Sequence, residues 1–593
     1  MYFLHLDIPT VVFLFGGIAL IVALVRDDAA GGEVGIALPV GKRLQEEAGL
    51  RPLSAALGQR FVLCAIHQKI TVLRNKGHGL IAALLVQKLV HKSVDHIQDI
   101  LLQANGIGHQ EGGELLLCSI HLTADSEGIG VDKELDEAFR WYKKAAMQGN
   151  AIAQCNLGNC YFNAYGVRQN FEEAFRWYTL SAGQGNTVAT FNLGMCHLLG
   201  EGTVENIDRG LELIYETATK GYARAQNELG EYYRDGCYVV KDTVEAIYWF
   251  SKAAAQGLDV AQYNMGLCYE QGNGVAPNAA RAVEWYRRSA SQGYAPAQYR
   301  LGECYYTGNG CTQNYSTAAE WYEKAAVQGN VDAQYLLAGC YYEGKGVDED
   351  HSRAVHWYEK AAEQGDAEAQ LNLAACYYYG DGVNTNLNRA ARWYEKAAEQ
   401  GNAEAQFCLA ECYFWGSGVD NDDILAFMWY NKAADNGYAP AYNVIGTLYS
   451  EGVIVSKNDS VAAGYFTQAA DLGCTDAFLN LGNCYYRGAG VEQNYLTALR
   501  CYIRAGEKGN AQAQYNLGVM YYKGIGVEQN FEEAVRWYLM AAEQGEALAQ
   551  YDLGICYYNG QGVPVNKEEA AGWFRLAAEQ GYKAASEALD AMD

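Results

Sequence analysis

A repeat of 36 residues constrains the fold of this chain more than any other feature of its sequence. The stretch 511–546, AQAQYNLGVMYYKGIGVEQNFEEAVRWYLMAAEQGE, holds two short helical patterns joined by a glycine-containing turn. The same template recurs twelve times from Ala151 to Tyr582 without an insertion or a deletion. Because neither pattern can bury its apolar stripe alone, the copies must stack, and the sequence predicts an all-α solenoid of helix pairs.

Within the unit, small residues and rings alternate on the faces that must pack. We expect glycine and alanine to let neighbouring helices approach, and the large rings to fill the space between repeats. Gly524 and Gly526 are predicted to end the first helix at positive φ, and Gly545 to do the same after the second. The apolar positions of the two predicted helices are Ala513, Leu517, Met520, Tyr521, Ala534, Trp537, Tyr538 and Ala541.

The first full copy carries a leucine-glycine pair followed by a tyrosine, at Leu157, Gly158 and Tyr161, and the turns read G-x-G-V. With the 36-residue period, this combination resembles the Sel-one-like repeat (SLR) family, a relative of the tetratricopeptide repeats, over residues 151–582. The resemblance implies a right-handed αα-superhelix of about twelve helix-turn-helix repeats. It also implies an adaptor that holds other proteins together, with the first helices lining the concave side.

The negative charge of this chain favours some classes of binding partner over others. The 593 residues have a formal net charge of -26, and nearly all of the excess acid lies after residue 127. Such a field repels a phosphate backbone, so the sequence argues against nucleic-acid binding and favours protein or peptide partners with basic segments. The alternative is that the acidity only keeps a long solenoid soluble.

Cysteines repeat with the unit and are expected to stay unpaired. Of the 17 cysteines, nine occupy one position of the first helix. Equivalent helices of successive repeats should lie about 10 Å or more apart, beyond the roughly 7 Å limit for a disulfide. We therefore interpret them as small buried hydrophobic residues in a reducing compartment, with the repeats in the cytoplasm. The nine are Cys160, Cys196, Cys268, Cys304, Cys340, Cys376, Cys412, Cys484 and Cys556.

The N-terminal part differs from the repeats. Residues 8–25 are apolar or small and long enough to cross a bilayer, so residues 1–28 are interpreted as a membrane anchor, with a signal peptide as the alternative. Residues 29–127 contain one aromatic residue and form an extension of uncertain structure. This extension is either a divergent cap or a stretch foreign to the protein.

The repeat pattern begins and ends with incomplete copies. Residues 128–150 match only the second half of the unit, and residues 583–593 read as one further first helix that caps the array.

The repeats 187–222, 223–258 and 439–474 depart from the template where a glycine or a tryptophan is expected. Leu213 and Tyr465 replace the tryptophan, while Tyr238 and Ile454 replace the second turn glycine. Because such residues adopt positive φ at a cost, we expect different turns and altered curvature near residues 236–242 and 452–460.

Signatures of catalysis are missing from the sequence. There is no HExxH, GxxxxGK[ST], GxSxG or SxxK motif, and we expect no catalytic residues, cofactor or metal. Cys408 and Cys412 lie one turn apart, but core packing explains them better than a metal. The interpretation is a non-enzymatic adaptor or scaffold. The alternatives are a regulatory subunit of a membrane-associated enzyme, attached through residues 8–25, or a β-lactam-interacting SLR protein.

The candidate binding residues follow from the resemblance, which places the variable positions of the first helices on the ligand side. Numbering each repeat from its first residue, as in Ala511, tyrosine recurs at position 5 and asparagine at position 6. These asparagines could bond an extended peptide while the tyrosines pack its side chains. Alternatively, the asparagines only satisfy neighbouring groups and the tyrosines belong partly to the core. The candidates are Asn192, Asn264, Asn372, Asn480, Asn516, Tyr263, Tyr299, Tyr335, Tyr515 and Tyr551.

Overall fold

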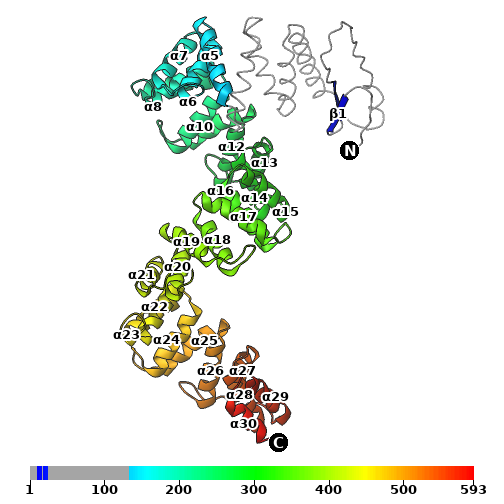
Figure 1. Ribbon diagram of the computed structural model, residues 1–593, viewed down its shortest axis with the longest axis vertical. Coiled ribbons are helices and arrows are strands. Elements are labelled where there is room, and N and C mark those ends of the chain that lie inside the picture. The colour runs from blue at the N-terminus through cyan, green and yellow to red at the C-terminus, as the bar shows by residue number, and fades with distance from the viewer. Residues whose placement is uncertain (1–9, 16–17, 24–131, 593) are drawn as a thin grey trace. The chain divides into compact units, whose positions relative to one another are not determined.

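The computed structural model describes residues 10–15, 18–23 and 132–592, and the described residues contain 26 helices, α5 to α30 (Figure 1). They form a solenoid of consecutive helix pairs, which confirms the all-α repeat architecture expected from the 36-residue period. The chain divides into two compact units, residues 1–177 and 178–593.

Every repeat contributes a first and a second helix, each 13 residues long in the full copies. The first helices are α6 (Ala151–Asn163), α8 (Thr187–Leu199), α10 (Ala223–Asp235), α12 (Asp259–Gln271), α14 (Ala295–Thr307), α16 (Val331–Glu343), α18 (Ala367–Tyr379), α20 (Ala403–Trp415), α22 (Ala439–Glu451), α24 (Thr475–Arg487), α26 (Ala511–Lys523), α28 (Ala547–Asn559) and α30 (Lys583–Asp590). The second helices are α5 (Asp132–Met147), α7 (Phe171–Gly183), α9 (Ile207–Thr219), α11 (Thr243–Ala255), α13 (Ala279–Ser291), α15 (Tyr315–Val327), α17 (His351–Glu363), α19 (Leu387–Glu399), α21 (Asp423–Asp435), α23 (Asp459–Asp471), α25 (Tyr495–Glu507), α27 (Phe531–Glu543) and α29 (Lys567–Glu579).

Capping residues set where these helices begin and end. The side chain of Asn510 accepts a hydrogen bond from the backbone N–H of Ala513 at 2.9 Å, which caps α26. Gly524 ends the same helix in the left-handed conformation, as its place in the turn predicts. Asn530 then caps α27 through the backbone N–H of Glu533 at 2.9 Å. Each full repeat has Asn or Asp at the position of Asn530, so the second helix begins at the same position of every full repeat.

The core between the two helices of a repeat pairs a small residue with a ring. In the repeat 511–546, a Cβ added to Gly518 would lie 2.4 Å from the ring of Tyr538, so the glycine makes room for the tyrosine. Both Tyr538 and Trp537 are buried, as the sequence pattern predicts. In the first unit, Tyr142, Leu157 and other residues of α5 and α6 form a separate core cluster.

Where position 4 of a repeat is glutamine, a chain of buried amides joins that repeat to the one before it. The side-chain amide of Gln514 at position 4 donates to the backbone oxygen of Gly506 in the preceding repeat, at 2.9 Å. Its own oxygen accepts a hydrogen bond from Gln544 at position 34, at 2.7 Å. The same three-part chain recurs around Gln262, Gln298, Gln334 and Gln370. Because Gln514 is 1% exposed, its polar atoms need these partners.

The segment predicted to be an apolar membrane helix is described as two strands. β1 (Thr10–Phe15) pairs antiparallel with β2 (Ile18–Ala23), with Phe15 opposite Ile18. Valine, isoleucine and phenylalanine favour strands, and the Gly-Gly dipeptide between them is typical of a hairpin turn. The prediction of a membrane helix used only the length of the apolar stretch. Across the described residues, we find no helix with the length and apolarity needed to span a bilayer. The proposed membrane attachment through residues 8–25 is thus unsupported, and residues 29–127 lie outside the described part.

The expectation of different turns at Tyr238 and Ile454 was wrong. Both residues adopt positive φ, 64° and 63°, like the glycines at the same position of other repeats. The following helices, α11 and α23, begin at the usual repeat position. The surrounding packing therefore holds a tyrosine and an isoleucine in a conformation that costs about 1–2 kcal/mol.

The cysteines are free wherever the structure describes them. All nine at the repeated position of the first helix are buried, as predicted. Cys408 and Cys412 lie within the same packed core as their neighbours, and burial raises the pKa of each thiol to about 12.

Candidate functional site

The exposed side of the first helices carries the candidate binding residues. It is built from repeat positions 2, 5, 6, 9, 12 and 13, which share one side of a helix, and we refer to it as the first-helix face. Positions 3, 7 and 10 of the same helices point into the core, as Ala513, Leu517 and Met520 show by their burial. The residues of this face vary from repeat to repeat, as Tyr335, Leu371 and Phe407 show at position 5.

The five candidate tyrosines at position 5 are half-buried because each packs its ring against the second helix of its own repeat. Tyr263 lies 5.8 Å from the ring of Tyr286, and Tyr335 lies 6.0 Å from the ring of Tyr358. Equivalent pairs are Tyr299 with Tyr322, Tyr515 with Tyr538, and Tyr551 with Phe574. One side of each candidate ring is thus committed to the core, and only the remainder can contact a ligand.

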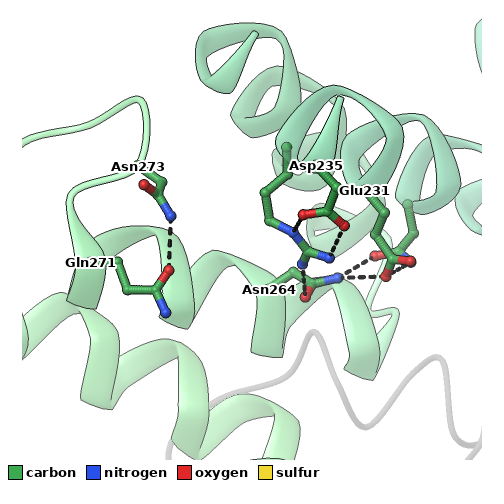
Figure 2. Close-up of polar contacts among 7 residues, drawn as sticks. Glu231, Asp235, Asn264, Gln271 and Asn273 are labelled. Carbon is green, nitrogen blue, oxygen red and sulfur yellow. Dashed lines mark hydrogen bonds and ion pairs between the residues drawn. The ribbon is translucent and has the colours of Figure 1, made fainter. Parts of the chain in front are cut away.

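Asn264 is the most enclosed of the candidate asparagines, at 4% exposed. Its side-chain nitrogen donates to the side-chain oxygen of Asn227 at 3.0 Å and to Glu231 at 3.1 Å. Its oxygen accepts from Arg234 at 3.2 Å, and Arg234 also pairs with Asp235 (Figure 2). With both ends of its amide engaged, Asn264 joins two repeats and offers no free group to a peptide.

Contacts of this kind link position 5 of one repeat to position 6 of the next at several junctions. Asn480 donates to Asn443 at 2.9 Å, 37 residues earlier. Asn372 is hydrogen-bonded to the hydroxyl of Tyr335, again 37 residues earlier. The hydroxyl of Tyr515 likewise donates to the carboxylate of Asp552. Where position 5 is Leu371 or Phe407, the partner is apolar as well, Cys408 or Val444.

Asn192 and Asn516, the two remaining candidates, are half-buried on the same face. The residue 37 positions before Asn516 is Leu479, which cannot accept a hydrogen bond from it. The candidate asparagines therefore do not form one uniform row, because the partner of each depends on the preceding repeat.

Two hollows in the first-helix face include four of the candidate residues. The first has a volume of about 480 Å³ and is lined by Tyr263, Asn264, Glu231, Arg234 and seven other residues, among them Gln271 and Asn273. Asn273 donates a hydrogen bond to Gln271 at 2.8 Å (Figure 2). The second has a volume of about 340 Å³ and is lined by Tyr335, Asn372, Tyr342, Glu343 and six others. Both join aromatic surface to carboxylates, which suits a ligand with apolar and cationic parts.

Burial perturbs several carboxyl groups of this face. Burial raises the pKa of Asp552, and the hydrogen bond from Tyr515 opposes that effect. The pKa of Glu228 is raised by burial first and then by the carboxylate of Glu231. A cation placed beside either group would relieve part of the cost of keeping it charged.

Comparison with known families decides what kind of chain this is. The family model described as the Sel1 repeat matches thirteen consecutive segments: 120–150, 151–186, 187–222, 223–258, 259–294, 295–330, 331–366, 367–402, 403–438, 439–474, 476–510, 511–546 and 547–582. The chain belongs to the Sel1-repeat family. Sel1-repeat proteins generally mediate protein–protein interactions, and the family is typically non-enzymatic.

A solved structure agrees with this assignment. The Sel1-repeat array is similar to a protective antigen with an SLR fold from uropathogenic Escherichia coli, at 32% identity and a TM-score of 0.66, over 77% of this chain and 96% of that one. A Sel1 repeat protein from Oxalobacter formigenes is 30% identical, with a TM-score of 0.43, over 55% of this chain and 93% of that one. A search of curated proteins finds no match. Neither alternative role, membrane-enzyme subunit or β-lactam-interacting protein, gains support.

Two exposed residues of the first-helix face were not predicted from the sequence as candidate binding residues. Tyr379 and Trp415 occupy position 13 of neighbouring repeats and are 72% and 68% exposed. The sequence did distinguish Trp415, because it does not stand at the tryptophan position of the template. Trp393 and Trp429 occupy that position in the preceding repeat and in the repeat of Trp415 itself. A large aromatic residue with no assigned place in the core is a candidate contact residue.

Proposed function

We propose that this Sel1-repeat chain is a non-enzymatic scaffold that binds other proteins through the first-helix face. The observation that carries the proposal is the hollow lined by Tyr335, Asn372, Tyr342 and Glu343, where aromatic and carboxylate groups converge on a surface built by successive repeats. Recognition by such a surface needs shape and a few placed polar groups rather than reactive side chains.

The proposal also specifies the class of partner. Carboxylates predominate on this face, and the chain as a whole has a net charge of -26. A partner segment with lysine or arginine would be attracted to it, and raising the ionic strength would weaken the attraction. Of the candidate residues, Tyr335 and Asn372 lie where a partner can reach them, while Asn264 holds neighbouring repeats together.

Site-specific photo-crosslinking of the full chain tests this function. A photoreactive amino acid replaces Glu368, which is exposed on the first-helix face, or Glu395, which is exposed on the second helix of the same repeat. Incubation with an extract of the source cells should give protein adducts from position 368. Adducts that form only from position 395, or none from either position, would contradict the proposed function.

Two single substitutions then ask which asparagine contacts the partner. Asn372→Ala should weaken binding of the crosslinked partner, whereas Asn264→Ala should chiefly destabilise the junction between α10 and α12. Equal affinity of the unchanged chain and the Asn372→Ala variant would leave Asn372 with a structural role alone.

A further inference from the structure

Four consecutive first helices carry carboxylates and no cation. The helices α16, α18, α20 and α22 contain no lysine, arginine or histidine. Cations interrupt the acidity in α10, α14, α24 and α26, through Arg234, Arg300, Arg487 and Lys523, whereas α12 and α28 carry carboxylates without a cation but stand singly. The six carboxylates of the four helices are Asp332, Glu343, Glu368, Glu404, Glu411 and Glu451.

The most exposed aromatic rings among the described residues lie in the middle of this stretch. Tyr379 and Trp415 end α18 and α20, at 72% and 68% exposed. Glu343 and Glu451 occupy the same position 13 of the repeats before and after them. The indole nitrogen of Trp415 donates to Glu411 at 2.9 Å, which fixes the ring and places a carboxylate at its edge. We call position 13 of these four repeats, with Glu411, the aromatic–acidic row.

The chain shows elsewhere what such rings bind. On the second helices, the ammonium groups of Lys324, Lys396 and Lys432 each lie 3.8 Å from the centre of a tryptophan ring, namely Trp321, Trp393 and Trp429. Within residues 132–592, by contrast, no cation of the chain covers the ring of Trp415 or Tyr379. A ring of this kind, beside a carboxylate, suits a guanidinium or ammonium group supplied from outside.

We propose that the aromatic–acidic row binds an extended segment of a partner protein with an arginine at every third residue. The inference rests on the proposed function and names the chemistry of its partner. Equivalent first helices of successive repeats should lie about 10 Å or more apart, and a polyproline II segment places every third side chain on one face at intervals of roughly 9 Å. Successive guanidinium groups would then lie over Tyr379 and Trp415, with Glu411 and Glu451 as counter-charges. Glu343 already lies 4.0 Å from the ammonium of Lys345.

Fluorescence anisotropy with the full chain tests this proposal. The probe is a labelled peptide of three Arg-Pro-Pro triplets, and the matched control replaces each arginine with citrulline, which keeps the planar group and loses the charge. We expect saturable binding of the arginine peptide alone. Trp415→Ala should weaken it about two- to fivefold, the range of a cation–π contact at an exposed site. Asn559→Ala changes position 13 of another repeat and should leave the affinity unchanged.

The outcomes separate this inference from the proposed function. If the arginine and citrulline peptides bind alike, or if Trp415→Ala and Tyr379→Ala bind as tightly as the unchanged chain, the inference is wrong even where crosslinks at position 368 uphold the scaffold function. Sedimentation of the chain alone tests whether a second copy of this chain, rather than another protein, occupies the aromatic–acidic row. Self-association that Trp415→Ala abolishes, without binding of the arginine peptide, would also overturn the proposal.

Discussion

Gln544 donates a side-chain hydrogen bond of 2.7 Å to the oxygen of Gln514, while the nitrogen of Gln514 donates to a backbone oxygen of the preceding repeat. The two side chains change together along the chain. Where position 4 is Phe478, position 34 is Lys508, whose ammonium lies 5.6 Å from the centre of that ring and donates to the backbone oxygen of Gly473 at 2.8 Å. An amide pair is thus exchanged for a ring and a cation, and no buried amide is left without a partner.

This relationship predicts the effect of Gln514→Phe. The change leaves Gln544 without its acceptor and Gly506 without its donor, so it should destabilise the repeats around α26 by about 1–3 kcal/mol. Adding Gln544→Lys recreates the arrangement of the preceding repeat and should recover part of the loss. Hydrogen exchange of the α26 and α27 peptides measures the local stability. Strictly additive effects of the two substitutions would show that the pair is not coupled.

Tryptophan substitutions should separate core from surface. Trp537 is 4% exposed, and Trp537→Ala should cost about 3–5 kcal/mol through lost burial and the cavity left behind. Trp415→Ala removes the same side chain from a position that is 68% exposed, and should change stability by less than about 0.5 kcal/mol. Urea unfolding followed by circular dichroism compares the two variants. A large loss of stability in the Trp415→Ala variant would also disqualify it as a binding probe.

The repeat architecture could be predicted from the sequence because its causes are local. Asn510 and Gly524 cap a helix through neighbours a few residues away. The spacing of Trp537 from Ala534 and Ala541 places it on the apolar side of its helix and predicts that it is buried. The role of Asn264 could not be predicted in the same way, since it depends on Asn227, 37 residues earlier. A pattern examined within one unit shows which positions vary, but the partners of those positions lie in the next unit.

The glycines of the two turns should differ in how well they tolerate a side chain. Gly382 has a φ of +68°, and a Cβ there would lie 2.2 Å from the backbone oxygen of His351 in the preceding repeat. Gly401 has a φ of +92° with open space around the added atom. Gly401→Ala should therefore cost about 1–2 kcal/mol from the backbone conformation alone. Gly382→Ala should cost more, because the repeat contact must also open. Thermal unfolding midpoints of the two variants compare the costs, and equal midpoints would contradict the steric argument.

Thiol chemistry should report the packing of the first helices. Burial raises the pKa of Cys340 and Cys376 to about 11, so at pH 8 only about one thiol in a thousand is the reactive thiolate. Cys237 is exposed, and iodoacetamide can reach it in the folded chain. Peptide mapping by mass spectrometry after brief treatment at pH 8 should show modification of Cys237 before either buried cysteine. In urea the pKa of the buried thiols returns to its ordinary value and all three should react. Rapid modification of Cys340 or Cys376 in the folded chain would mean that adjacent repeats separate on the timescale of labelling.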